Sequence, residues 1–330
     1  MARDVQIDMI NTKKIISLLL LTAYCAVSIT GCGSNSLPLA YKEVNTIQST
    51  NQVDNKASGF ATNLAVTAED VEGITGVQVE DQSSAGLFDV NRHEVLYAKD
   101  IHQTLAPASL TKIMTALVAL KYGNTEDVIT CSDAVLDIDY DATKIGLKPG
   151  DQLTMNQALH ALLINSANDA AIAIAEHIGG SVENFAEMMN EEALLLGATN
   201  SHFVNPHGLS DADHYTTAYD LYLITRAAME YNIFNEIIQM TEYETVYNDS
   251  NGGEKSMKFA TTNLFLRGDY SAPERVTVIG GKTGTTNAAG NCLVLVVKDT
   301  GGNPYIGVVL RASERTIVNQ EMAEILREIN

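Results

Sequence analysis

Positive charge is scarce in this chain of 330 residues, because 21 lysines and arginines stand against 41 aspartates and glutamates. The formal net charge at pH 7 is −20. A surface of that sign repels phosphate groups, which argues against a nucleic-acid-binding protein and against a polybasic membrane-binding patch. An anionic ligand would have to be bound by a few local cations, so each candidate lysine and arginine needs its own argument.

Cysteine is also rare, with four residues in the whole chain. Cys25 lies in an apolar N-terminal run and Cys32 follows that run closely, which leaves Cys131 and Cys292 for the folded part. A chain of this length with 45% hydrophobic residues can bury a core without disulfides. Because both remaining cysteines stand among apolar residues, we predict that they are buried and unpaired.

The apolar run over residues 15–30 is short for a membrane-spanning helix. Two lysines precede it, as in the basic segment of a secretory signal. The sequence ITGC, residues 29–32, resembles the lipobox of bacterial lipoproteins. That resemblance implies a signal peptide over residues 1–31 and a lipid on Cys32. The alternative is an uncleaved N-terminal anchor helix.

Residues 32–75 are rich in polar side chains and show no sustained hydrophobic period, which predicts a flexible tether. Residues 76–330 form the predicted folded domain. Two apolar runs around an Asn-Arg-His turn predict a hairpin over residues 85–100. Helical spacing of apolar residues predicts a helix from Ser109 to Gly123. It also predicts helices over residues 155–164, 168–180, 182–197 and 217–231.

Three β-branched runs near the C-terminus predict strands over residues 275–284, 292–299 and 304–312, and an amphipathic helix is predicted over residues 316–329. The turns between these strands are short and contain glycine, which favours antiparallel pairing. The two groups of strands are therefore predicted to form one antiparallel sheet flanked by helices, with a mainly helical insert. This is an α+β fold rather than a doubly wound one.

Ser109 and Lys112 lie at the start of the first long helix, in the sequence SLTK. At this spacing the hydroxyl and the amine share one helix face, with Cβ atoms about 5–6 Å apart, so a hydrogen bond is feasible. The helix N-terminus also favours negative charge on the serine oxygen. The arrangement suits a serine nucleophile that is activated by lysine. An ordinary N-cap serine beside a surface lysine has the same pattern.

Two further short motifs have ordinary structural explanations when each is considered alone. The sequence SAN, residues 166–168, lies between two predicted helices, where serine and asparagine are common caps. The sequence KTGT, residues 282–285, lies on a predicted strand. A phosphate-binding loop is excluded there, because Val276 occupies the position of a required glycine and a strand follows instead of a helix. Lys282 therefore needs another anionic partner.

In this order and at domain-length spacing, the Ser-x-x-Lys, Ser-x-Asn and Lys-Thr-Gly motifs resemble the three signatures of penicillin-binding proteins and serine β-lactamases. Longer stretches are similar to the serine D-alanyl-D-alanine carboxypeptidases, the low-molecular-weight penicillin-binding proteins of peptidase family S11. These stretches are PASLTKIMTALVAL, INSANDAA, FVNPHGL, TTAYDL and GGKTGTTNAAGNCLV. The resemblance extends from about Ser83 to about Leu326.

The resemblance implies a serine β-lactamase/transpeptidase-like fold for residues 76–330. It also implies an enzyme that removes the terminal D-alanine from peptidoglycan stem peptides ending in D-Ala-D-Ala, with β-lactams as covalent inhibitors. The family needs no cofactor and no metal. Many relatives carry a second, β-rich domain and a C-terminal membrane helix. In this sequence a lipid on Cys32 would replace that helix as the anchor, on the outer face of the bacterial cytoplasmic membrane.

The resemblance also implies roles for the motif residues. Ser109 would attack the carbonyl carbon of the penultimate D-alanine and form an acyl-enzyme. Lys112 would be the general base, with its pKa lowered by burial and by the nearby charge of Lys282. Ser166 would pass a proton to the departing D-alanine, and Asn168 would hold the substrate backbone.

The third motif is implied to bind the end of the substrate. Lys282 and Thr283 would bind the terminal carboxylate, and the backbone amides of Ser109 and Thr285 would form the oxyanion hole. Gly284 is expected to leave room for a substrate lying along the strand edge. Relatives also place an arginine after the last strands. Arg311 and Arg315 are both candidates for that position.

Four other functions share part of this pattern. A DD-endopeptidase that cuts cross-linked peptidoglycan would use every residue named above, and carboxypeptidase is preferred only because it is the commoner activity among similar proteins. A class A β-lactamase needs a glutamate after the Ser-x-Asn motif, where the sequence reads HFVNPHGLSDADHY. A zinc peptidase is suggested by His202, His207 and His214, but the chain has no His-Glu-x-x-His. A penicillin-binding sensor would keep the fold without turnover.

Overall fold

A computed structural model of the chain describes residues 63–329. The predicted signal peptide, the lipid site at Cys32 and most of the predicted tether lie outside these residues. Within the described part of the chain, no helix is both long enough and apolar enough to cross a membrane. The free cysteines Cys131 and Cys292 are both buried, which confirms the prediction for this pair.

Five strands form the main sheet in the order β2-β1-β9-β8-β7, and all neighbouring strands are antiparallel. The strands are β1 (Ser84–Asp89), β2 (Glu94–Lys99), β7 (Thr277–Thr286), β8 (Gly290–Lys298) and β9 (Pro304–Ala312). The predicted hairpin and the three predicted C-terminal strands thus share one sheet, which confirms the antiparallel α+β prediction. Strand β7, which carries the KTGT motif, is an edge strand of this sheet.

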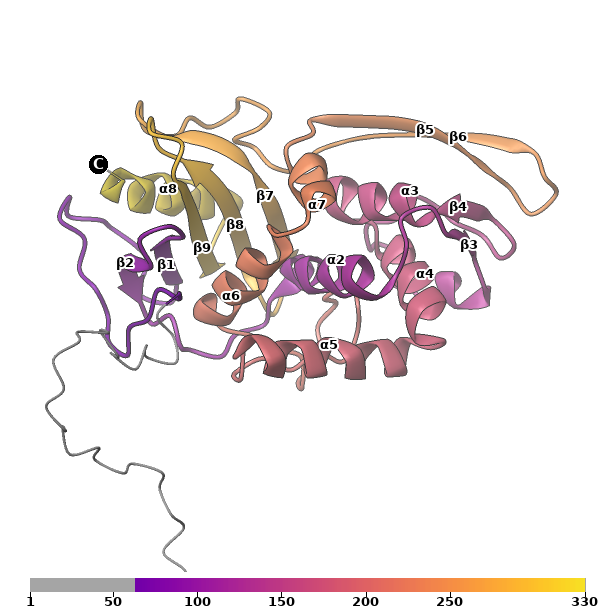
Figure 1. The fold of residues 1–330 in the computed structure, drawn as a ribbon, viewed down its shortest axis with the longest axis horizontal. Coiled ribbons are helices and arrows are strands. Elements are labelled where there is room, and N and C mark those ends of the chain that lie inside the picture. Colours follow the sequence, from indigo (N-terminus) through magenta and orange to yellow (C-terminus); the bar gives the residue numbers. More distant parts are fainter. Residues whose placement is uncertain (1–62, 330) are drawn as a thin grey trace, which may run out of the picture. The chain divides into compact units, whose positions relative to one another are not determined.

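Helices cover both faces of the main sheet (Figure 1). Alternate residues of β8 point to opposite sides, as the two-residue period of a strand requires. Leu293 and Leu295 share a cluster with helix α8 (Arg315–Ile325), whereas Val294 and Val296 belong to the larger cluster formed with the other helices. Both faces are therefore buried, and β8 is apolar along most of its length.

The remaining helices lie between β2 and β7 in the chain and include every helix predicted there. They are α2 (Thr111–Tyr122), α3 (Met155–His160), α4 (Asn168–Gly179), α5 (Val182–Leu196), α6 (Ala218–Ala228) and α7 (Asn232–Ile238). Short helical turns accompany them: η1 (Ala108–Leu110) precedes α2, η2 (Asp133–Leu136) precedes α3, and the π-helical η3 (Ala161–Asn165) follows α3. A further turn, η4 (Leu326–Glu328), follows α8. Helix α2 is the most enclosed, because residues 111–119 are all buried. A helix that is buried all round lies inside the core.

The insert also contains a second sheet, so its description as mainly helical was incomplete. Four strands pair in the order β3-β4-β5-β6: β3 (Val128–Thr130), β4 (Gln152–Thr154), β5 (Glu242–Asn248) and β6 (Glu254–Ala260). In Figure 1, β5 and β6 form a long hairpin that extends past α3. Most of its side chains are exposed or half-buried, so it lacks the apolar alternation by which a strand is usually predicted.

The folded part begins earlier than the predicted boundary at residue 76. Val71 exchanges two backbone hydrogen bonds with Ala98 of β2, at 2.8 and 3.0 Å. Ala65 is fully buried, and its amide donates to the Tyr222 hydroxyl. The carboxylate of Glu328 accepts the amides of residues 74 and 75. These contacts are isolated rather than periodic, so a period-based prediction assigned residues 63–75 to the tether.

Candidate active site

The first motif pairs Ser109, in the turn η1, with the buried Lys112 in the first turn of α2. Lys112 Nζ lies 2.9 Å from Ser109 Oγ. The same amine donates to Asn168 Oδ1 at 2.6 Å and to the His207 carbonyl at 2.5 Å. Lys112 is fully buried. The predicted pairing of Ser109 with Lys112 is therefore present, and three oxygens fix the position of the amine.

The second and third motifs form a second serine–lysine pair. Ser166 follows the π-helical turn η3 in a left-handed backbone conformation, with φ of 68°. Its hydroxyl accepts a hydrogen bond of 2.9 Å from Lys282 Nζ, which also donates to the Thr283 carbonyl. Lys282 is 1% exposed. The lysine that was expected to bind a carboxylate thus contacts a serine hydroxyl directly.

Burial changes the protonation of both lysines. It lowers the pKa of Lys112 well below the ordinary value of 10.5; the nearby charge of Lys282 lowers this pKa further, and Asp169 opposes both effects. Burial also lowers the pKa of Lys282 to about 7. Desolvation disfavours the charged form of an amine, so both amines lose a proton more readily than a surface lysine does. A neutral Lys112 amine can accept the proton of the Ser109 hydroxyl.

Strand β7 approaches the start of α2 closely, and Gly284 makes that approach possible. A Cβ atom at Gly284 would lie 3.0 Å from Ser109 N, 3.1 Å from Ala108 Cβ and 3.1 Å from the Pro107 carbonyl. A side chain at this position would thus collide with residues 107–109 of the protein itself. The expected role of this glycine, to leave room for a substrate, stays a prediction. The glycine brings the edge of β7, including Thr285, against the backbone at Ser109.

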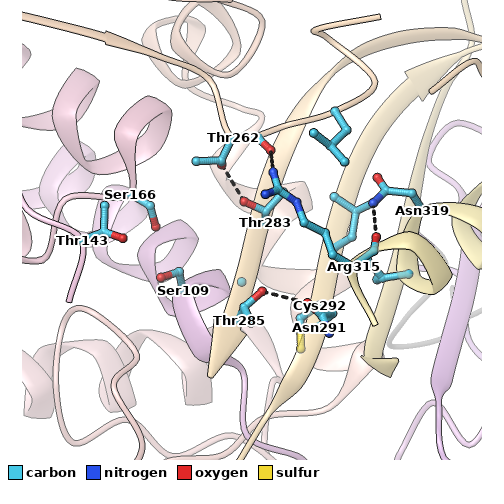
Figure 2. Close-up of a pocket in the computed structure, with 14 residues that line it drawn as sticks. Ser109, Thr143, Ser166, Thr262, Thr283, Thr285, Asn291, Cys292, Arg315 and Asn319 are labelled. Atoms are coloured by element: carbon cyan, nitrogen blue, oxygen red, sulfur yellow. Dashed lines mark hydrogen bonds between the residues drawn. The ribbon is translucent and has the colours of Figure 1, made fainter. Parts of the chain in front are cut away.

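A pocket of about 240 Å³ opens between the serines and the edge of β7. Ser109, Ser166 and Thr143 lie on one side of it, and Thr283 and Thr285 lie on β7 (Figure 2). A second pocket adjoins Ser109 and is lined by Asn168 and Thr285, among others. Every motif residue with a predicted role lines one of the two pockets, except Lys112 and Lys282, which lie buried behind them.

Arg315 is the arginine that reaches this pocket. Its guanidinium donates to the Thr262 carbonyl at 3.2 Å, and the Thr262 hydroxyl lies 2.6 Å from that of Thr283 (Figure 2). Arg311 does not line the pocket. The sequence offered two arginines without a means to choose between them, and it offered no motif around Thr262.

A buried aspartate holds the loop that carries Thr143. The Asp169 carboxylate accepts backbone amides from residues 145, 146 and 147, at 2.8 to 3.1 Å. The backbone N–H of Asn168 donates to the Thr143 carbonyl at 2.9 Å. The first turn of α4 thus fixes the wall of the pocket opposite β7. Asp169 follows the Ser-x-Asn motif directly but was not identified from the sequence.

The three histidines do not form a metal site. Among residues 63–329, no group of three His, Cys, Asp or Glu side chains is arranged to hold a metal ion. His207 Nδ1 accepts the Leu209 amide, and His202 Nδ1 contacts the Asp213 carbonyl. Burial lowers the pKa of His207 to about 3 and that of His214 to about 4. Their ring nitrogens serve in structural hydrogen bonds, so the zinc-peptidase alternative is not supported.

Comparisons with known proteins agree on one family. A family model described as D-alanyl-D-alanine carboxypeptidase matches residues 73–314. The chain is 33% identical to the D-alanyl-D-alanine carboxypeptidase DacF of Bacillus subtilis over 258 residues, which cover 76% of this chain and 63% of DacF. It is 35% identical to DacB2 of Mycobacterium tuberculosis over 232 residues, which cover 70% of this chain and 71% of DacB2. The chain thus spans just under two thirds of the length of DacF.

The fold is similar to that of solved structures in the same group. The DD-transpeptidase of Streptomyces K15 superposes with a TM-score of 0.69 at 28% identity, over 76% of this chain and 98% of that protein. A D-alanyl-D-alanine carboxypeptidase from Mycobacterium tuberculosis gives a TM-score of 0.67 at 28% identity, over 78% and 95% of the two chains. These matches confirm the predicted serine β-lactamase/transpeptidase-like fold.

Replacing Lys282 with methionine should raise the pKa of Lys112, because it removes a positive charge that disfavours protonation of Lys112. The ¹³C signal of Lys112 Cε, followed through a pH titration, reports this pKa, and its midpoint should move to higher pH. Lys298→Met removes the same charge from the exposed end of β8 and should leave the midpoint in place. An equal midpoint in wild type and Lys282→Met would contradict the coupling of the two amines.

Proposed function

This chain belongs to the D-alanyl-D-alanine carboxypeptidase family, and from that membership we propose that it removes the terminal D-alanine from peptidoglycan stem peptides. The observation that carries the proposal is the contact of 2.9 Å between Ser109 Oγ and the buried amine of Lys112. A serine hydroxyl is a weak nucleophile at neutral pH, and an adjacent base of low pKa makes it reactive. The reaction is proposed from family membership, and the contact with Lys112 identifies Ser109 as the proposed nucleophile.

Acylation begins with Ser109. Its Oγ attacks the carbonyl carbon of the penultimate D-alanine, while the neutral amine of Lys112 takes the hydroxyl proton. Negative charge develops on the carbonyl oxygen, where the backbone amides of Ser109 and Thr285 can donate to it. The close approach of β7 at Gly284 supports this role for the two amides.

Collapse of the tetrahedral intermediate breaks the peptide bond. The departing amine of the terminal D-alanine needs a proton, and Ser166 Oγ, which accepts from Lys282 Nζ at 2.9 Å, can deliver one. The ester on Ser109 then reacts with water, which restores the hydroxyl and releases the shortened peptide. Asn168 fixes the Lys112 amine through its side-chain oxygen and lines the pocket where the substrate backbone would lie.

Three side chains are suited to bind the terminal carboxylate. Arg315, Thr262 and Thr283 line the pocket on one side of Ser109 and are linked to each other by hydrogen bonds. An arginine and two hydroxyls can donate to both oxygens of a carboxylate. Lys282 lies behind this surface with only 1% of the residue exposed, and its protonated amine adds positive charge near the pocket. The site therefore attracts an anion locally, despite a net charge of −20.

Other reactions on an acyl-enzyme differ in what leaves and what attacks. An endopeptidase would cut a cross-link, and a transpeptidase would pass the acyl group to an amine. The similarity to the Streptomyces K15 DD-transpeptidase is the reason to test for transpeptidation as well. The residues that line the two pockets beside Ser109 include no glutamate to activate a deacylating water, which disfavours a class A β-lactamase. β-Lactams should nevertheless acylate Ser109 as covalent inhibitors.

We further propose that the protein is a lipoprotein on the outer face of the bacterial cytoplasmic membrane. The support is the lipobox-like sequence at residues 29–32, after an apolar run and two lysines. A single acyl chain binds membranes only marginally, so stable anchoring would need more than one chain on the modified cysteine. The polar residues that follow would then connect the anchor to the folded domain.

A fluorescent penicillin should label the full chain at Ser109, because this hydroxyl has the activating base. Peptide mapping should find the adduct on Ser109 in wild type and none in Ser109→Ala. Ser132→Ala, which removes a hydroxyl that caps η2, should label like wild type. Label of equal intensity in Ser109→Ala would rule out Ser109 as the nucleophile.

Mass spectrometry of the products identifies the reaction. From a pentapeptide ending in D-Ala-D-Ala, the proposal predicts a tetrapeptide and free D-alanine. A cross-linked muropeptide should remain intact, and an added amine acceptor should not be incorporated. Cleavage of the cross-link alone would indicate an endopeptidase. A stable acyl-enzyme without released peptide would indicate a sensor.

Arg315→Gln should weaken substrate binding, because a charge-assisted hydrogen bond of roughly 1.5–3 kcal/mol is lost. The KM for a D-Ala-D-Ala peptide should rise about tenfold or more. Arg311→Gln is the matched control and should leave KM unchanged, since Arg311 does not line the pocket. A rise in KM for Arg311→Gln with none for Arg315→Gln would reverse the assignment.

Cys32→Ser should abolish lipid attachment, because the thiol that would carry the lipid is gone. Bacterial cells grown with an alkyne-tagged fatty acid should incorporate the tag into wild type and not into the variant. Cys25→Ser, within the apolar run, should still be tagged. Equal tagging of wild type and Cys32→Ser would exclude this lipid site.

A further inference from the structure

The peptide unit between Ala108 and Ser109 is held in an uncommon conformation. Ala108 is not a glycine, yet its φ is 49°, in the left-handed region. Residues with a Cβ atom occupy this region rarely, and such strain persists only when surrounding contacts impose it. Ala108 is 1% exposed and directly precedes the proposed nucleophile. Its contacts should therefore identify the groups that impose this conformation.

Two buried side chains act on the carbonyl of Ala108. The Thr111 hydroxyl donates to that carbonyl at 2.8 Å, and Thr111 Oγ1 lies 2.8 Å from His214 Nε2. The Thr111 backbone N–H donates to the same carbonyl. Thr111 is fully buried and His214 is 3% exposed. Gly208 packs against the same carbonyl, since a Cβ atom there would lie 1.9 Å from the Ala108 oxygen.

The protonation of His214 gives this chain of hydrogen bonds a direction. His214 Nδ1 accepts the Val204 amide at 3.1 Å, so this nitrogen carries no proton. The ring proton of the neutral imidazole is then on Nε2 and is donated to Thr111 Oγ1. The Thr111 hydroxyl in turn has only its own proton to give, and it gives it to the Ala108 carbonyl. Each donor in the chain is thus matched to one acceptor.

The carbonyl of Ala108 and the amide of Ser109 belong to one planar peptide unit. In a trans peptide the C=O and the N–H point in opposite directions, so fixing one fixes the other. We propose that Thr111 and His214 are positioning residues that hold this plane, so that the Ser109 amide points at the oxyanion of the substrate. This inference rests on the proposed acylation of Ser109. It assigns a role to two residues outside the three motifs.

Thr115 provides an internal comparison. It lies one turn further along α2 and is fully buried, as Thr111 is. Its hydroxyl donates to the Pro206 carbonyl at 2.6 Å, in the same segment that carries Gly208. A valine at either position therefore removes a buried threonine hydroxyl that binds a backbone carbonyl. Only the change at Thr111 removes a hydrogen bond from the Ala108 carbonyl, which then keeps the Thr111 backbone amide as its donor.

The test measures acylation by a fluorescent penicillin in the full-length protein, with the first-order acylation rate separated from the dissociation constant of the initial complex. Thr111→Val should lower the rate at least about tenfold, a fraction of the hundred- to thousandfold loss that follows removal of a whole oxyanion donor. The dissociation constant should change by less than about twofold, because the loss affects the transition state. Thr111→Ser keeps a hydroxyl and should retain most of the wild-type rate.

Thr115→Val is run in parallel, and thermal unfolding of all variants is recorded. It should lose stability to a similar degree as Thr111→Val and keep the wild-type acylation rate. His214→Gln, which retains an N–H donor, should acylate faster than His214→Leu. Thr111→Val acylating at the wild-type rate, or Thr115→Val losing as much rate as Thr111→Val, would overturn the inference. Wild-type protein that forms no adduct at Ser109 would instead overturn the proposed function.

Discussion

Two lysine amines are buried beside two serine hydroxyls, and the arrangement of the site follows from this burial. An ammonium group loses its hydration when it is buried, so the neutral form becomes favourable. The charge of Lys282 adds electrostatic repulsion that lowers the pKa of Lys112 further. The chain thereby holds an amine of low pKa beside Ser109. Each amine is also satisfied by oxygen acceptors, as buried polar groups require.

The fold supplies these contacts from distant parts of the sequence. The turn η1 carries Ser109, helix α2 carries Lys112 into the core, and α4 presents Asn168 to the lysine. Strand β7 brings Lys282 to Ser166, and Gly284 allows the strand to lie against the backbone of Ser109. Left-handed backbone at Ala108 and Ser166 costs of order 1–3 kcal/mol at each residue, and the surrounding core must offset it. Both strained positions thus lie beside a buried lysine, because Ala108 precedes Ser109, the partner of Lys112, and Ser166 is bonded to Lys282.

The sequence was most informative where the hydrophobic pattern is strong. The N-terminal hairpin, α2 and the apolar strands β8 and β9 were predicted near their observed positions, because buried elements show clear periods. The hairpin β5–β6 was missed, since most of its side chains are exposed. Helical spacing predicted that the side chains of Ser109 and Lys112 lie on one face, where a hydrogen bond is feasible. Thr262 could not be found in this way, and Arg315 could not be distinguished from Arg311, because tertiary contacts between distant elements form this part of the site. His214 was named only as a possible zinc ligand, and its contact with Thr111 is likewise tertiary.

The central claim is that a neutral, buried Lys112 is the base for Ser109. The most direct measurement compares two pH profiles of wild-type protein: the first-order rate of acylation by penicillin, and the titration of Lys112 observed through its ¹³Cε signal. The account predicts that the rate falls as pH decreases through the pKa of Lys112, well below 10.5, so that the two midpoints coincide. A rate that stays constant while Lys112 takes up its proton, or a Lys112 that titrates near 10.5, would contradict it.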